Sequence, residues 1–197
     1  SRVIPGFLEA WPDLQVELLL TDRRVDLIRE GIDVALRIGS MPDSQMYARK
    51  LATCRHVVCA APSYLKRCPP PLTPSELVDH ACIIDTNQAR SWWFQGASGV
   101  QREEVTGRYR VNSAHAVRDM ALSGFGIAYM PTFVAGPCIQ RGAMRPILKA
   151  YQKLSLPLHA LFPERRFLSA RVRTIVNAMQ DSFHAPTPWD AFMSDGA

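Results

Sequence analysis

Helical and extended patterns alternate along the opening of the chain, and this alternation constrains the fold more than any other feature. Residues 3–11 carry large apolar side chains at helical spacing, and Pro12 ends that helix because it has no amide hydrogen to donate. Residues 14–20 predict a strand that becomes buried on both faces, residues 25–31 a short helix, and residues 34–38 a second strand. Helices between successive strands predict βαβ units and a parallel sheet, which is an α/β fold.

The rest of the 197-residue chain continues in shorter elements. Strands are predicted at residues 47–51, 56–60, 81–84, 92–94, 100–105, 109–111, 127–130 and 156–162. Helices are predicted to begin at Pro62, Thr73, Asn112, Pro131 and Ser169, where a proline or a capping side chain precedes an apolar pattern. The last helix is the clearest, because its apolar side chains from Val172 to Phe183 follow the helical period.

Composition excludes several classes of protein. Apolar residues make up 47% and charged residues 21% of the chain, close to the averages for soluble globular proteins. No apolar run reaches the roughly 18 residues needed to span a bilayer, and no signal peptide is recognisable, so neither membrane insertion nor secretion is expected. The five cysteines are odd in number and form no CxxC pair, which favours reduced thiols in the cytoplasm over a disulfide framework.

Motifs for catalysis, cofactors and metals are not found in the sequence. The five histidines lack metal-ligand spacing, and the chain contains no P-loop, no GxGxxG and no GxSxG motif. We therefore expect no metal, no cofactor and no enzymatic activity. The net charge of +5 comes from basic residues spread along the chain, which indicates solvated surface rather than a nucleic-acid interface.

Polar residues near the ends of the first two predicted strands are candidates for ligand binding, because ligands of open α/β sheets sit outside the carboxyl ends of the strands. Thr21 and Asp22 follow one strand and precede a helix, so they either contact a ligand or only cap that helix. Arg37 lies in an otherwise apolar strand and needs a partner, either a protein carboxylate or an anionic ligand. Gly39 would allow close approach to the backbone.

A second group of candidates surrounds the predicted helix that begins at Asn112. Asn112 and Ser113 open this helix, and the free N–H groups of a helix start can bind an anion. Simple capping by either side chain is the alternative. Gly126 follows the same helix and completes this group of candidates, with backbone geometry as the alternative explanation for the glycine.

Two further candidates lie near strand ends in the middle of the chain. Thr86 follows the predicted strand at residues 81–84 and could offer its hydroxyl to a ligand. A tryptophan in a binding site supplies a flat apolar wall, whereas in a core it fills volume. One of the adjacent pair Trp92 and Trp93 is expected in the core, and Trp93 is taken as the ligand-binding candidate.

Four segments in the same order resemble a known family. Residues 21–39, reading TDRRVDLIREGIDVALRIG, resemble the signature of the effector-binding domain of LysR-type transcriptional regulators. Residues 59–65, reading CAAPSYL, resemble the strand and helix that follow in that family. Residues 112–131 and 161–173 resemble its later helix, tight turn and buried strand, and its closing strand and helix. Together the four segments span almost the whole chain, from about residue 2 to residue 183.

The resemblance implies a fold like that of the type II periplasmic binding proteins. Two Rossmann-like α/β subdomains would be joined at a hinge by two crossover strands, with a ligand site in the central cleft. Subdomain I would comprise residues 1–55 and 158–183, and subdomain II residues 56–157. Residues 184–197 have no periodic pattern and predict a flexible tail.

The chain departs from the family pattern in two respects. The winged helix-turn-helix and its linker helix are absent, so the chain itself is not expected to bind operator DNA. The family's domain also begins with a strand ahead of the helix that starts here at Val3, and this first strand is missing. Because removing a central strand leaves unpaired backbone groups, we expect the sequence to be part of a longer protein.

The resemblance implies an effector-sensing domain of a bacterial LysR-type regulator in the cytoplasm. A small anionic or aromatic metabolite would bind in the cleft and shift the hinge equilibrium. The domain would form a homodimer through residues 3–11 and 117–122, and the intact protein a tetramer that binds DNA. A free-standing solute-binding protein of the same fold is the alternative, and an enzyme on this scaffold is a third possibility.

Overall fold

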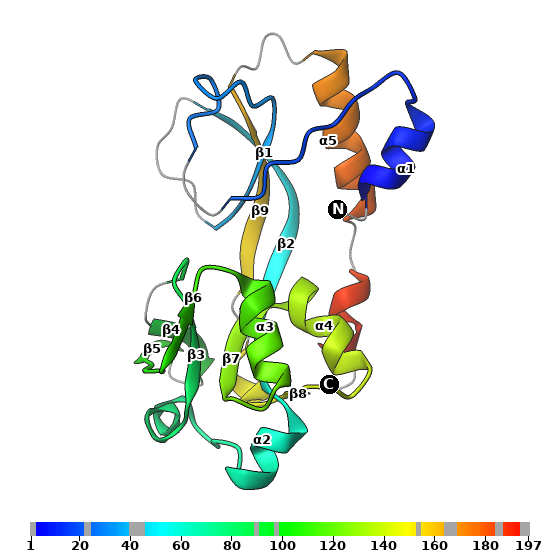
Figure 1. Ribbon diagram of the computed structural model, residues 1–197. Coiled ribbons are helices and arrows are strands. Elements are labelled where there is room, and N and C mark those ends of the chain that lie inside the picture. The colour runs from blue at the N-terminus through cyan, green and yellow to red at the C-terminus, as the bar shows by residue number, and fades with distance from the viewer. Residues whose placement is uncertain are drawn as a thin grey trace. The chain divides into compact units, whose positions relative to one another are not determined.

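The computed structural model describes residues 3–21, 25–39, 46–88, 91–96, 99–152, 155–163, 169–183 and 187–193 (Figure 1). The chain divides into two compact units, and each unit is built from two separate stretches. Unit 1 comprises Ser1–Thr53 and Leu156–Thr187, and unit 2 comprises Cys54–Ser155 and Pro188–Ala197. No helix within the described ranges is long and apolar enough to cross a membrane.

Unit 1 combines two helices with part of a sheet. Helix α1 (Val3–Ala10) lies against α5 (Ala170–Ser182), as Figure 1 shows. Strand β1 (Ala35–Ile38) pairs antiparallel with β9 (Ser155–Phe162), which lies beside the long β2 (Tyr47–Ala60). Buried side chains of β2, β9 and α5 form the core of this unit, namely Leu51, Ala160, Val172 and Val176. The predicted cap of the last helix is confirmed, because the Val172 N–H donates to Ser169 Oγ at 3.3 Å.

The first predicted strand is wrong. Residues 14–20 are extended but form no strand, and Leu18, Leu19 and Leu20 are 54%, 56% and 83% exposed. A strand needs a neighbour to pair with its backbone groups, and in the described part of the chain no strand pairs with this segment. The helix predicted at residues 25–31 is also wrong, since residues 27–31 form turns.

Unit 2 is built on a mixed sheet. Its strand order is β2, β7 (Ile127–Pro131), β3 (Cys82–Asp85) and β6 (Tyr109–Val111), and β8 (Arg145–Pro146) pairs with β2. Strand β3 runs parallel to both β6 and β7, whereas β2 runs antiparallel to β7. Unit 2 thus contains parallel strands, and α3 (Ala114–Leu122) connects β6 to β7. The βαβ unit predicted over residues 14–38 is wrong, because residues 14–20 form no strand and β1 pairs antiparallel with β9.

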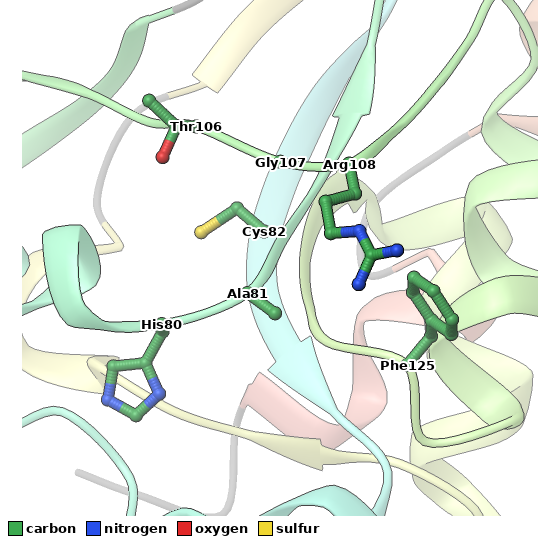
Figure 2. A pocket seen from close by; sticks show the side chains of 7 residues that line it. All are labelled: His80, Ala81, Cys82, Thr106, Gly107, Arg108 and Phe125. Carbon is green, nitrogen blue, oxygen red and sulfur yellow. The ribbon is translucent and has the colours of Figure 1, made fainter.

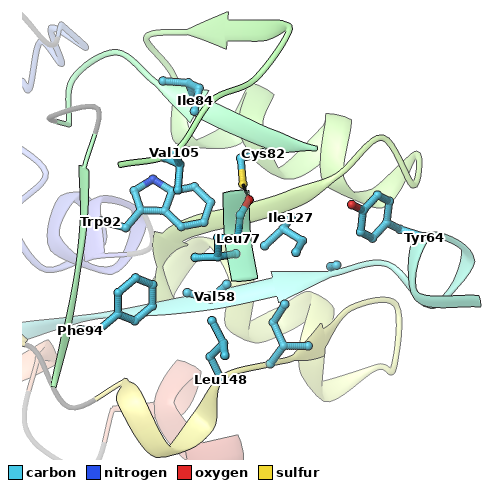
Figure 3. Packing of buried hydrophobic residues seen from close by; sticks show 12 residues of the cluster. Val58, Tyr64, Leu77, Cys82, Ile84, Trp92, Phe94, Val105, Ile127 and Leu148 are labelled. Atoms are coloured by element: carbon cyan, nitrogen blue, oxygen red, sulfur yellow. Dashed lines mark hydrogen bonds between the residues drawn. The ribbon is translucent and has the colours of Figure 1, made fainter. Parts of the chain in front are cut away.

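Alternate residues of the unit 2 strands supply two cores. Val57 and Ile83 point to one face, where α3 and α4 (Thr132–Gln140) cover the sheet. Val58 and Ile84 point to the other face, which packs against the ribbon of β4 (Ser91–Gly96) and β5 (Gly99–Glu104) (Figure 3). This period of two is the geometry of any β-strand. The remaining elements of this face are α2 (Pro62–Arg67), η1 (Pro74–Asp79) and η2 (Lys149–Tyr151).

The chain passes between the two units three times. Strands β2 and β9 make the first two passages, between Thr53 and Cys54 and between Ser155 and Leu156. The third passage lies between Thr187 and Pro188. The sequence predicts a flexible tail after residue 183, but within it Pro188–Met193 forms a 3-10 helix, η3, that packs on α4. The apolar side chains of this short segment follow no regular period, so the sequence does not predict the helix. The helix forms where the segment contacts α4.

Candidate functional site

The parallel strands of unit 2 bring two predicted site residues together at their carboxyl ends. Asp85 of β3 lies beside Val111 of β6, so the residues that follow, Thr86 and Asn112, leave the sheet at the same edge. The Thr86 N–H donates to the carbonyl oxygen of Val111 at 2.8 Å, which extends the parallel ladder by one residue. Both side chains are exposed. Thr86 and Asn112 therefore offer a hydroxyl and an amide to a ligand at this edge.

Asn87 is a residue of this edge that the sequence interpretation missed. The Asn87 N–H donates to Asp85 Oδ1 at 3.0 Å, and its side-chain Nδ2 donates to the carbonyl oxygen of Asn112 at 2.7 Å. Asp85 is buried and therefore anchors the turn. The two loops after β3 and β6 are thus tied to each other. The available signal was an Asp-Thr-Asn sequence directly after a buried strand, which is typical of a side-chain-stabilised turn.

Ser113 acts as the N-cap of α3. Its Oγ accepts a hydrogen bond from the Ala116 N–H at 3.5 Å, so the capping alternative is confirmed for this residue. The first N–H groups of a helix have no intrahelical acceptor, and the helix dipole places partial positive charge there. Since the N-cap Ser113 directly follows Asn112, this positive end lies at the same edge as Thr86. The edge is electrostatically suited to a carboxylate or another small anion.

His56 is a second edge residue that the sequence interpretation passed over. It pairs with Pro131, so it lies beside the carboxyl end of β7, and only 7% of its surface is exposed. Its ring stacks on Tyr129 with centroids 5.0 Å apart. Burial lowers the pKa of His56 to about 4, so the imidazole is neutral at physiological pH. Burial raises the pKa of Tyr129 to about 12, and the electrostatic effect of the nearby Cys54 thiol is a smaller cause of the same rise.

The adjacent tryptophans have separate environments, as predicted. Trp92 is 2% exposed, and its ring lies 5.5 Å from that of Tyr129, within the core drawn in Figure 3. Trp93 points to the opposite face of the β4–β5 ribbon and is 46% exposed. The guanidinium of Arg102 lies 5.8 Å from the centre of the Trp93 ring, a cation–π arrangement. The accessible tryptophan is therefore partly covered by a neighbouring strand residue.

Gly126 lies at the opposite end of the unit 2 strands. It precedes β7 directly, and its neighbour Ile127 lies beside Cys82 at the beginning of β3. A Cβ at Gly126 would overlap the carbonyl oxygen of Ala81, so close packing of backbone requires the glycine. An open pocket of about 510 Å³ lies at this end, with Arg108 directed toward Phe125 (Figure 2). Gly126 is thus separated from the edge that holds Thr86 and Asn112.

Three predicted site residues of unit 1 can be located. Thr21 is exposed and directly follows residues 14–20. Arg37 is half-buried in β1 and lies opposite His159 of β9. Gly39 has a φ of +110°, a conformation that strongly favours glycine, and its N–H donates to the Pro157 carbonyl at 3.0 Å. Asp22 lies outside the described residues.

Comparisons with known proteins identify the family. The family described as LysR substrate binding domain matches residues 1–184. The chain belongs to this family. It is 34% identical to an uncharacterized HTH-type transcriptional regulator of Haemophilus influenzae, covering 87% of this chain and 60% of that protein. It is 32% identical to the HTH-type transcriptional regulator PtxR of Pseudomonas aeruginosa, covering 92% and 59% respectively.

The fold of the LysR substrate-binding domains is also found by structural comparison. The regulatory domain of CrgA, a LysR-type transcriptional regulator from Neisseria meningitidis, superimposes with a TM-score of 0.84 and 25% identity, covering 93% of this chain and 91% of that one. The predicted fold class is therefore confirmed as the α/β fold of these regulatory domains, which resembles that of type II periplasmic binding proteins. The chain spans about 60% of the length of its curated relatives, and both relatives are regulators, which favours a regulator domain over a free-standing solute-binding protein.

Proposed function

We propose that this LysR substrate-binding domain senses a small anionic or aromatic metabolite. The carboxyl-terminal edge of the unit 2 strands carries this proposal. Thr86, Asn112 and the positive end of α3 present hydrogen-bond donors at one place, and Asn87 holds the two loops in register. These are groups that bind a carboxylate. Arg37, Thr21 and Gly39 are the proposed contribution of unit 1, and Trp93 the proposed aromatic contact.

The whole protein's activity belongs to the same proposal. Units 1 and 2 would be regulatory subdomains I and II, and effector binding would shift a hinge equilibrium between them. A DNA-binding helix-turn-helix outside residues 1–197 would read this change, in a cytoplasmic homodimer or tetramer. Support comes from relatives that are HTH-type regulators and are longer than this chain.

A thermal-shift screen with benzoate, salicylate and small dicarboxylates tests the proposed effector site. A ligand that binds only the folded chain adds about 2.7 kcal/mol of apparent stability at 100 times its Kd. We expect at least one of these acids to raise the melting temperature. We expect Arg37→Met to weaken binding about 10- to 100-fold, because a charge-assisted hydrogen bond contributes about 1.5–3 kcal/mol.

Arg173→Met is the matched control, since Arg173 is an exposed arginine of α5 in the same unit. This control should keep the response of the parent chain. If Arg37→Met also keeps it, Arg37 has a structural role only. If no acid in the screen stabilises the chain, the proposed preference for anions is wrong.

A further inference from the structure

The C-terminal segment Pro188–Met193, called the C-terminal clip below, is anchored to unit 2 by three kinds of contact. Its η3 helix lies beside α4, where it is drawn in red in Figure 1. The main chain comes so close to α4 that a Cβ on Gly136 would overlap the carbonyl oxygen of Trp189. Such an approach requires a glycine in the middle of a helix, where alanine would otherwise be preferred.

Charge and apolar burial add to this anchorage. Asp190 Oδ2 lies 3.6 Å from the guanidinium of Arg55, and the Asp190 side chain is only 7% exposed. Arg55 belongs to β2 and is the second residue after the passage from unit 1 to unit 2. Phe192 packs against the core that α3 and α4 cover. The clip is thus attached both to a helix of unit 2 and to the strand that enters it.

The clip is joined to unit 1 by a short stretch of chain. Helix α5 ends at Ser182 and Phe183 is its C-cap, so five peptide steps separate Phe183 from Pro188. Five residues span at most about 18 Å when fully extended. Any motion that carries Phe183 farther than this from the docked clip must either undock the clip or unwind the end of α5.

We propose that the C-terminal clip is a third restraint on the motion between the two units. Without the clip, strands β2 and β9 would be the two remaining connections between the units. The docked clip and its short tether limit that motion to what about 18 Å of chain permits. This inference rests on the hinge motion of the proposed function, but it does not depend on which ligand the domain binds.

Pulsed EPR distances between the units test the proposed restraint. Spin labels would be placed at Lys66 of α2 and Arg173 of α5, both exposed, through cysteine substitutions in a Cys68→Ser chain. The other native cysteines, Cys54, Cys59, Cys82 and Cys138, are buried. Eight Gly and Ser residues inserted between His184 and Ala185 lengthen the tether, and a flexible linker of that length has a root-mean-square span of about 15 Å.

We expect the insertion to broaden the distance distribution by about 5 Å or more while circular dichroism is unchanged. The same eight residues appended after Ala197 form the matched control and should leave the distribution as in the parent chain. An undocked variant, Asp190→Lys with Phe192→Asp, should broaden it as the insertion does. Identical distributions for the parent and the insertion chain would overturn the proposal, and so would broadening by the insertion without broadening by the undocked variant.

Discussion

Replacing His56 with phenylalanine is expected to remove most of the acid sensitivity of unit 2 between pH 6.5 and pH 4. The pKa of His56 falls from 6.5 to about 4 on folding because the ring is buried. Within this window the unfolded chain binds a proton at this residue and the folded chain does not, so stability rises with pH. The contribution of His56 to the free energy of unfolding is fully present above pH 6.5, and about 3 kcal/mol of it is lost as the pH falls to about 4.

Urea unfolding at several pH values between 7.5 and 4.5 measures this difference. As the pH is lowered, the urea midpoint of the parent chain should fall steeply, and the midpoint of His56→Phe should fall much less. Phenylalanine keeps an aromatic ring against Tyr129, so the change in slope, rather than the absolute stability, carries the result. His115 is exposed, and His115→Phe should retain the slope of the parent. If the urea midpoint changes with pH equally in the parent and in His56→Phe, then His56 is protonated in the folded chain.

The substitutions Trp92→Ala and Trp93→Ala are expected to differ strongly although the residues are adjacent. Trp92 is 2% exposed and packs among apolar residues between the sheet and the β4–β5 ribbon. Its removal should cost about 3–5 kcal/mol of stability, through lost burial and the cavity left behind. Trp93 is 46% exposed, and its removal should cost less than about 1 kcal/mol, the value of an exposed cation–π contact with Arg102.

Thermal unfolding followed by circular dichroism measures both variants without depending on tryptophan fluorescence. Trp93→Ala serves as the control for Trp92→Ala, because both changes remove the same side chain from the same strand. Equal losses would mean that the ribbon does not pack through Trp92. Trp93→Ala has a second use, since a loss of the thermal shift by an aromatic acid in a stable variant would support Trp93 as a ligand contact.

Elements with strong local signals were predictable from the sequence. The last helix has both a period of apolar side chains and a serine cap, and the structure forms it from Ala170 to Ser182. The helix after Ser113 is likewise capped by that residue. In both cases the decisive interaction lies within a few residues.

Features that depend on distant neighbours could not be predicted in the same way. The segment 14–20 has the pattern of a buried strand, yet no described strand pairs with it, so its leucines are exposed. His56 has a lowered pKa because segments far apart in the sequence exclude water from its ring. Gly126 is required by the close approach of the carbonyl of Ala81, about 45 residues earlier in the chain.

The α/β class, the capped helices and the family could be predicted from the sequence, because they depend on local periodicity and on motifs in a fixed order. Contacts between segments far apart in the sequence determine which tryptophan is buried, where His56 lies and what the last residues form. The C-terminal clip illustrates the difference, since its few apolar and acidic residues have no period of their own. They form an ordered element only because Gly136, Arg55 and the core beneath Phe192 provide a surface for them.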